Sequence, residues 1–410
     1  MSQLTFVSKT VLQDLPDDVL LSIFTYFSHG ELCQIIGCVC RHWHSLSRDP
    51  CLWKHINLSN YSHSMTYQAI KTACHYFRTA YSLKLPCYDC FKDDNLVSIV
   101  RFCPTLYKID CSFCVAITCQ AIVSLVDCCP NLIDINLEGS NIKDRAVQVM
   151  SKLKLRSINL SHCTRLTDES LYLLGNGYSY LEIVNLDGIE FNQSAVIYFI
   201  ALCKDRIKSI CIDGANLSDF ALEFISHCKL LHKLDISFCD QMTSAALYHL
   251  RALKDLRSLR LKKGHNFTND ALNDLFNYVI LTRNIHWSCH ITLLDLTECS
   301  QLDNNGLHSI AANCPQLKEL NLSWCWNISD TGVDYILRMC RLLVSVILIG
   351  LHQITCNNLV DAPSFWKYLK FLNLTCCNSV KDSVVKELAR NMKNLLIIDY
   401  YGERIDLMQP

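Results

Sequence analysis

One apolar position recurs through most of the 410-residue chain at a nearly constant step, and this period constrains the fold more than any other feature. The leading residues are Leu106, Leu132, Leu155, Leu181, Ile207, Leu231, Leu256, Ile291, Leu317, Leu343, Leu369 and Leu395. All steps but one lie between 23 and 26 residues, and further apolar side chains or Cys follow each leader at its third and fifth successors. Ala80 begins an earlier unit of the same kind. A fixed period in this range predicts an array of stacked supersecondary units.

The second half of each unit has a different spacing. A turn follows the strand-like half, and then comes a stretch with helical spacing, as in residues 330–337. Asp168, Asp219, Asp330 and Asp382 precede such stretches, where a carboxylate is expected to cap the free N–H groups of a helix start. Each unit is therefore predicted to be strand, turn and helix. Stacking such units gives an α/β fold, a right-handed leucine-rich-repeat solenoid shaped as a horseshoe, with a parallel inner sheet and outer helices.

Cysteine follows the same period. One set lies eight residues after a leading residue, namely Cys114, Cys163, Cys239, Cys299, Cys325 and Cys377, and a second set lies three residues before one, namely Cys103, Cys129, Cys228, Cys314 and Cys340. The pattern resembles the cysteine-containing leucine-rich-repeat subfamily, which implies that the first set is buried at the strand-to-loop turn. Most of the 26 cysteines are therefore expected to be reduced and to pack as small apolar side chains.

Two cysteine pairs also have the spacing of a zinc half-site, Cys87-x-x-Cys90 and Cys111-x-x-Cys114. The repeat itself accounts for the second pair, because Cys111 occupies a strand core position and Cys114 belongs to the periodic set. No metal and no other cofactor is therefore predicted.

The N-terminal segment has a separate pattern. It begins with Leu15-Pro16, continues with apolar residues at helical spacing, and ends with Cys40-Arg41-His42-Trp43 and Leu52-Trp53. This segment resembles the F-box family, which implies a small all-α domain that binds a Skp-type adaptor and, through it, a cullin and a RING subunit. The residues expected to bind the adaptor are Leu15, Pro16, Leu20, Ile23, Phe24, Leu32, Val39, Cys40, Trp43, Leu46, Leu52 and Trp53. A purely capping role for these helices is the alternative, since repeat arrays need caps.

These patterns divide the chain into five parts. They are an N-terminal tail at 1–12, an F-box at 13–58, a connecting helical segment at 59–79, about 13 repeats at 80–402, and a C-terminal tail at 403–410. The one long step, from Leu256 to Ile291, indicates an insertion near 277–290. Such an insertion is either a tolerated surface loop or a binding element.

The inner face of the array is the predicted recognition surface, because alternate strand side chains point to it. The residues expected to bind a protein substrate there are Phe113, Asp235, Phe238, Arg260, Lys262, Asp295, Asn321 and Trp324. Aromatic anchors among polar residues are typical of interfaces. Arg260, Lys262 and Lys263 also form a basic cluster, which favours either an anionic partner or simple solvation.

Composition restricts the function. The net charge is −1 and the pI about 6.9, which predicts no general attraction to nucleic acid or to anionic membranes. The longest apolar stretch, around 342–351, is too short for a bilayer span, and residues 1–13 lack the layout of a signal peptide. The C-terminus carries no prenylation Cys, so no membrane anchor is expected. No P-loop, Rossmann fingerprint or H-E-x-x-H motif occurs, and the chain is predicted not to be an enzyme.

The resemblance and the surface together predict the substrate-recognition subunit of an SCF-type ubiquitin ligase, in the cytoplasm or nucleus. The F-box would dock the adaptor, the inner face would hold a protein substrate, and ubiquitin transfer and proteasomal degradation would follow from proximity. A structural subunit of an axonemal or ciliary regulatory complex is the alternative. A ligand-gated receptor that uses the basic cluster is a third interpretation.

Overall fold

The computed structural model describes residues 15–59, 74–86, 91–280 and 285–405. The chain divides into two compact units, Met1–Leu155 and Arg156–Pro410, called unit 1 and unit 2 below. Within the described ranges, no helix is long and apolar enough to cross a membrane.

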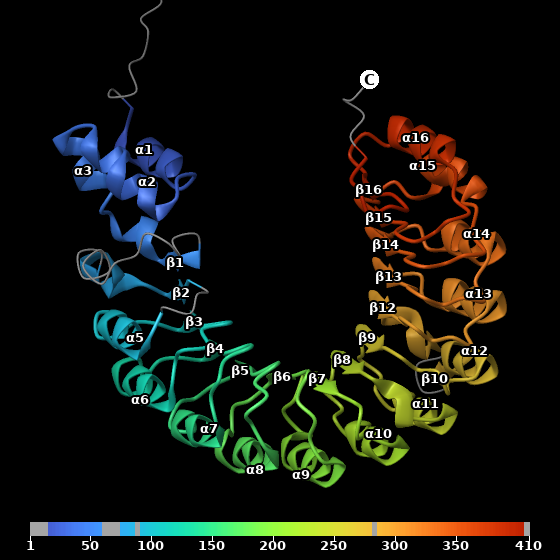
Figure 1. Cartoon of the computed structure of the whole chain (residues 1–410), viewed down its shortest axis with the longest axis horizontal. Coiled ribbons are helices and arrows are strands. Elements are labelled where there is room, and N and C mark those ends of the chain that lie inside the picture. Colours follow the sequence, from blue (N-terminus) through green and yellow to red (C-terminus); the bar gives the residue numbers. More distant parts are fainter. Residues whose placement is uncertain (1–14, 60–73, 87–90, 281–284, 406–410) are drawn as a thin grey trace, which may run out of the picture. The chain divides into compact units, whose positions relative to one another are not determined.

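Unit 1 begins with short helices and continues as a strand-and-helix stack (Figure 1). The helices are α1 (Asp17–Phe24), α2 (His29–Gln34), η2 (Ile36–Cys38), α3 (Arg41–Leu46) and η3 (Pro50–Trp53). The stack follows as β1 (His55–Asn57), η5 (Cys74–Thr79), β2 (Ser82–Lys84), α5 (Asp93–Val100), β3 (Lys108–Asp110), α6 (Cys119–Cys128), β4 (Asp134–Asn136) and α7 (Asp144–Met150). Strands β1 to β4 pair in parallel and in chain order, so the sheet already begins at His55.

Unit 2 repeats strand and helix from end to end. Its first part is β5 (Ser157–Asn159), α8 (Asp168–Gly177), β6 (Ile183–Leu186), α9 (Gln193–Cys203), β7 (Ser209–Asp213), α10 (Asp219–Ile225), β8 (Lys233–Ser237), η6 (Cys239–Gln241), α11 (Ser244–Leu250), β9 (Ser258–Leu261) and α12 (Asn269–Asn277). Its second part is β10 (Val279–Ile280), β11 (Ile285–His286), η7 (Trp287–His290), β12 (Leu293–Asp295), α13 (Asn304–Asn313), β13 (Glu319–Asn321), α14 (Asp330–Met339), β14 (Ser345–Ile347), η8 (Asn357–Asp361), α15 (Ala362–Phe365), β15 (Phe371–Asn373), α16 (Asp382–Asn391) and β16 (Leu396–Ile398).

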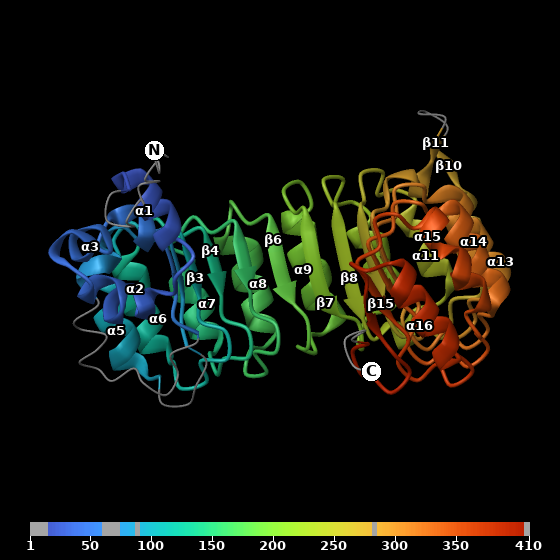
Figure 2. The same ribbon diagram turned by 90° about the horizontal axis from the view of Figure 1, so that it is seen from above.

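Among the described residues of unit 2, the strands form one parallel sheet in chain order, and the β10–β11 hairpin lies outside this sheet. Within this unit the strands line the inner side of a curved stack and the helices cover the outer side (Figures 1 and 2). The predicted leucine-rich-repeat solenoid is thereby confirmed.

The period of the sequence produces this stack directly. Every leading residue is buried. In all units but the last, the residue three positions later is buried too, as in Leu294, Leu320 and Val346, which lie in register on neighbouring strands. The last unit differs by one residue, because Ile397, and not Ile398, pairs with Leu372.

Hydrogen bonds between repeats fix the helix starts, and here the structure corrects the sequence. Asp168, Asp219, Asp330 and Asp382 are not the capping residues but the first helical residues, and the cap position belongs to the residue before each of them. The carboxylates of Asp168, Asp219 and Asp330 instead accept hydrogen bonds from the next repeat. Asp219, for example, accepts from the backbone N and the hydroxyl of Thr243, both at 2.6 Å. The acidic residue therefore ties one repeat to its successor, in addition to any favourable interaction with the helix dipole.

The turn after most strands adopts a left-handed backbone at the seventh position of the repeat, with Gly214 after β7 as an exception. φ lies between 55° and 73° at Phe113, Gly139, His162, Gly188, Phe238, Lys263, Glu298, Trp324, Gly350 and Cys376. An L-residue in this conformation costs roughly 1 kcal/mol or more relative to glycine. Cross-repeat hydrogen bonds hold the turns, since the N–H of Trp324 donates to the carbonyl of Ile349 at 2.7 Å. At the seven non-glycine positions, the chain therefore carries a side chain in spite of the backbone strain that glycine would avoid.

The periodic cysteines are buried thiols, as predicted. Several donate to a carbonyl of the preceding repeat, as Cys325 does to Leu296 at 3.1 Å and Cys377 to Leu348 at 2.9 Å. Burial raises the pKa of the Cys299 and Cys340 thiols to about 12. Cys114 donates to the carbonyl of Pro86 at 3.5 Å. The pair Cys87 and Cys90 lies outside the described residues.

Alkylation tests this assignment. Because the thiolate is the reactive species, iodoacetamide is expected to modify Cys299 and Cys340 at least about a hundredfold more slowly in the native than in the denatured protein. Exposed Cys38 serves as the internal control. Peptide mass spectrometry over a time course gives the rates. Intact-mass detection of several native disulfides would contradict the assignment.

Candidate functional site

The N-terminal helices build a small core of their own. Leu20, Phe24, Leu32, Leu52 and Trp53 are all buried in it. The indole N–H of Trp53 donates to the carbonyl of Ser47 at 2.9 Å, and the rings of Phe24 and Trp43 meet edge to face at 5.2 Å. Leu20 is among the residues predicted to bind the adaptor, but its side chain is fully buried in this core and is not available on the surface. These five residues shape the domain from within.

Other apolar side chains of the same segment are exposed. Ile35 is 56% and Val39 49% exposed, and Val19, Tyr26 and Phe27 are also open to solvent. Of the remaining predicted residues, Pro16 is exposed, and Leu15, Ile23, Cys40, Trp43 and Leu46 are half-buried. We call Val19, Ile35 and Val39 the F-box apolar residues. Large exposed apolar groups in so small a domain are typical of an interaction surface.

Only Val39 of these three was identified from the sequence. Val19 and Leu20 are neighbours, and a helical pattern does not say which of two apolar faces packs inward. The signal for Ile35 was equally ambiguous, because Ile36 beside it is the buried residue.

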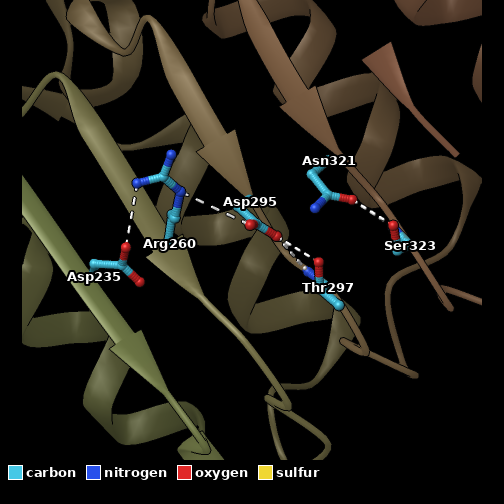
Figure 3. Close-up of polar contacts among 6 residues, drawn as sticks. All are labelled: Asp235, Arg260, Asp295, Thr297, Asn321 and Ser323. Carbon is cyan, nitrogen blue, oxygen red and sulfur yellow. Dashed lines mark hydrogen bonds and ion pairs between the residues drawn. The ribbon is translucent and has the colours of Figure 1, made fainter. Parts of the chain in front are cut away.

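The inner face of unit 2 contains an ion network at its middle (Figure 3). The guanidinium of Arg260 lies between two carboxylates, with Nη1 at 3.2 Å from Asp235 and Nε at 3.9 Å from Asp295. Asp235 and Asp295 are only 7% and 6% exposed. The interpretation of Arg260 as part of an open basic cluster is therefore corrected, because its charge is already neutralised within the sheet.

The polar residues beside this network end the strands. Oδ1 of Asp295 accepts from the N–H of Thr297 at 3.0 Å and from its hydroxyl at 2.6 Å. Oδ1 of Asn321 accepts from the N–H and hydroxyl of Ser323 at 3.0 and 2.6 Å in the same way (Figure 3). Equivalent bonds recur at Asn159, Asn185 and Asn373. Such side-chain turns replace the next ladder hydrogen bond, so Asp or Asn at this position has a structural role in the repeats that carry it.

The predicted aromatic anchors occupy the left-handed turns. The ring of Phe113 lies over Gly139 and the ring of Trp324 over Gly350, and a methyl group at either glycine would collide with that ring. Phe238 differs, because the next repeat offers Lys263, whose Nζ lies 4.1 Å from the ring centroid. Phe113 and Phe238 remain exposed.

The predicted substrate residues therefore fall into separate groups. Phe113 belongs to unit 1. In unit 2, Asp235, Arg260 and Asp295 are brought together as the ion network, and Phe238 and Lys263 pair at the turn that follows. Half-buried Lys262 precedes Lys263 at the end of β9.

The insertion after α12 is anchored to the stack. The buried hydroxyl of Ser288 donates to the carbonyls of Phe276 and Asn313 at 3.2 and 3.1 Å. Residues 279–280 and 285–286 pair as a short hairpin, and residues 281–284 of the predicted insertion lie outside the described residues.

Comparisons with known proteins identify the same two parts. The F-box-like family matches residues 12–59, and the leucine-rich-repeat family matches residues 152–175 and 313–337. The chain is 23% identical over 337 residues to the DNA repair protein RAD7 of Saccharomyces cerevisiae, covering 77% of this chain and 54% of the relative. It is 27% identical over 218 residues to F-box/LRR-repeat protein 4 of Bos taurus, covering 48% and 31%. The chain thus spans about half or less of the length of these relatives.

A solved structure agrees with the fold. The crystal structure of the yeast Rad7 and Elc1 complex contains a chain that matches with a TM-score of 0.68 and 17% identity, over 94% of this chain and 93% of that one. At this identity the match shows the fold alone.

A small helical domain with exposed apolar side chains precedes the stacked strand-turn-helix repeats. This arrangement is typical of repeat proteins that carry an N-terminal interaction domain. With the F-box-like match on the first part and the leucine-rich-repeat matches on the second, the chain combines the two kinds of domain found in F-box/leucine-rich-repeat proteins.

Proposed function

We propose that this protein is the substrate receptor of an SCF-type ubiquitin ligase. One observation carries the proposal: the F-box-like helices are complete around their own core and still expose Ile35 and Val39. A domain that needed only to cap the repeats would not require these side chains in solvent. The partners we propose are a Skp-type adaptor on this segment, with a cullin and a RING subunit joined through the adaptor.

We further propose that the chain performs no chemistry itself and acts in the cytoplasm or nucleus. F-box/leucine-rich-repeat receptors are typically non-catalytic. Ubiquitin transfer in such an assembly depends on holding the substrate near a charged conjugating enzyme.

The substrate surface that we propose lies on the strand-end turns of unit 2. In the ion network the guanidinium of Arg260 is already paired with Asp235 and Asp295, and both carboxylates are mostly buried, which leaves little of the network for a ligand. Phe238, by contrast, is exposed in a strained turn, and Trp324 occupies the equivalent turn further along. Strain retained at an exposed aromatic residue supports a binding role.

Affinity purification tests the assembly. The tagged chain, purified from cells treated with proteasome inhibitor, is expected to recover a Skp-type adaptor and a cullin. If every fraction that contains the chain lacked a cullin, the result would contradict the proposal and favour a structural complex.

Removal of both aromatic residues tests the substrate surface. Phe238→Ala with Trp324→Ala is expected to reduce substrate capture at least about tenfold, because truncating an interface anchor typically costs over 1 kcal/mol. The readout is proximity labelling under proteasome and cullin inhibition, compared between wild type and variant.

The controls separate binding from folding. Cullin recovery and the circular dichroism spectrum should stay unchanged in the double variant. Lys386→Glu, an exposed change on outer helix α16, should leave labelling intact. If the α16 change removed the labelled proteins and the aromatic pair did not, the surface would be wrongly placed.

A further inference from the structure

The outer faces of α9, α10 and α11 in unit 2 are unusually apolar. Helix α9 carries no charged residue, and Tyr198 and Leu202 are exposed on its outer side, one turn apart. On the next two helices Phe220 is 50% and Tyr248 67% exposed. These helices are successive neighbours in the stack (Figure 1). We call Tyr198, Leu202, Phe220 and Tyr248 the outer apolar patch.

The fold does not require this composition. Helix α12 holds the same place in its repeat and exposes Asp270, Asp274 and Asn277. Helix α16 likewise exposes Lys386, Glu387 and Arg390. Charged residues are therefore tolerated at the positions where α9, α10 and α11 carry aromatic and aliphatic groups. Several large exposed apolar side chains on three neighbouring helices are typical of a protein contact.

The patch is held in place by its neighbours. The ring of Tyr198 meets Tyr172 edge to face at 5.0 Å, and the Tyr198 hydroxyl is 3.1 Å from Nδ2 of Asn176. Leu202 packs against helix α8, where a methyl group on Gly175 would lie 2.9 Å from its Cδ1. Phe220 and Phe224 meet edge to face at 5.0 Å. Side chains fixed in this way lose little entropy when a partner covers them.

The charged residues around the patch are distributed unevenly between the N-terminal and C-terminal ends of its helices. Because successive strands are parallel, the helices run in one direction, and each places its N-terminus at the same edge of the stack. Carboxylates gather at the N-terminal edge and lysines at the C-terminal edge, namely Glu169, Glu190 and Asp219 against Lys204, Lys229 and Lys254. Arg165 and Asp205 are exposed residues of the opposite sign at the two edges. The charge at each edge interacts favourably with the helix dipoles there. The acidic edge of one copy is also complementary in charge to the basic edge of a second copy.

We propose that the outer apolar patch is the interface of a homodimer, with a second copy of this chain related by a two-fold axis. In such an isologous contact the same patch faces itself. An antiparallel arrangement sets the acidic edge of one copy against the basic edge of the other, while the apolar middle is buried. This interaction is separate from the F-box and from the substrate surface of the proposed function.

Sedimentation velocity on the full-length chain over a concentration series tests the proposal. Wild type should shift from monomer to dimer, and Leu202→Glu with Phe220→Glu should weaken dimerisation at least about a hundredfold, because two carboxylates would be buried without partners. Lys386→Glu with Arg390→Glu on α16 is the matched control and should dimerise as wild type does. Ile35→Asp with Val39→Asp should also dimerise, which excludes the F-box apolar residues as the contact.

A charge exchange adds a test that does not depend on the apolar core. Lys204→Glu with Lys229→Glu should weaken dimerisation, and adding Glu169→Lys with Glu190→Lys should restore it. Circular dichroism confirms that each variant is folded. A wild type that stays monomeric at the highest concentration reached would overturn the proposal, and so would a patch variant that still dimerises.

Discussion

Replacing Ile35 and Val39 together by Asp is expected to weaken binding of a purified Skp-type adaptor at least about a hundredfold. Both side chains are largely exposed and leave the F-box core untouched, so the fold of unit 1 should persist. The loss follows because each apolar contact is removed and an uncompensated charge would be buried in the interface. Isothermal titration calorimetry with the purified adaptor measures the change.

The choice of positions decides what this experiment tests. Leu20→Ala would leave a cavity in the domain core and cost about 2–5 kcal/mol of stability, so it reports on folding and not on the interface. Tyr368→Asp is the better control, because Tyr368 is a 60% exposed apolar residue of unit 2. Undiminished adaptor affinity in the Ile35 and Val39 variant, with wild-type affinity in the control, would contradict the docking proposal.

The repeat architecture was predictable because one pattern determines it many times over. Each leading residue and its third successor are buried for the same reason on every strand, so an error in one repeat is corrected by its neighbours. The same redundancy made the buried cysteines predictable. The exception is the last unit, where a shorter connection lets Ile397 take the central strand position.

Contacts between repeats were harder to predict. A carboxylate before a helical stretch suits a cap, and the sequence gives no reason to prefer the bridge that Asp219 makes to Thr243. Left-handed turns were missed because Phe238 and Trp324 are not residue types that favour that conformation. Glycine at three equivalent turns was the available signal, since the positions are aligned by the repeat.

The ion network could have been predicted from the sequence. Asp235, Arg260 and Asp295 share the fourth position of successive strands, and the structure pairs them in register. Adjacent side chains in one column of a parallel sheet are close neighbours, so alternating charges there indicate pairing and not an open basic cluster. What the sequence alone does not reveal is how deeply the two carboxylates are buried.

Replacing Arg260 by Met is therefore expected to lower the free energy of unfolding by about 3 kcal/mol, because two mostly buried carboxylates would lose their shared cation. Adding Asp235→Asn with Asp295→Asn should recover most of that loss, since the remaining amides carry no charge. Lys262→Met, two residues along the same strand end, should change stability by less than about 0.5 kcal/mol. Denaturant unfolding of the four proteins supplies the values. If Arg260 instead served an exposed anion site, its loss would cost little stability and the two asparagines would rescue nothing.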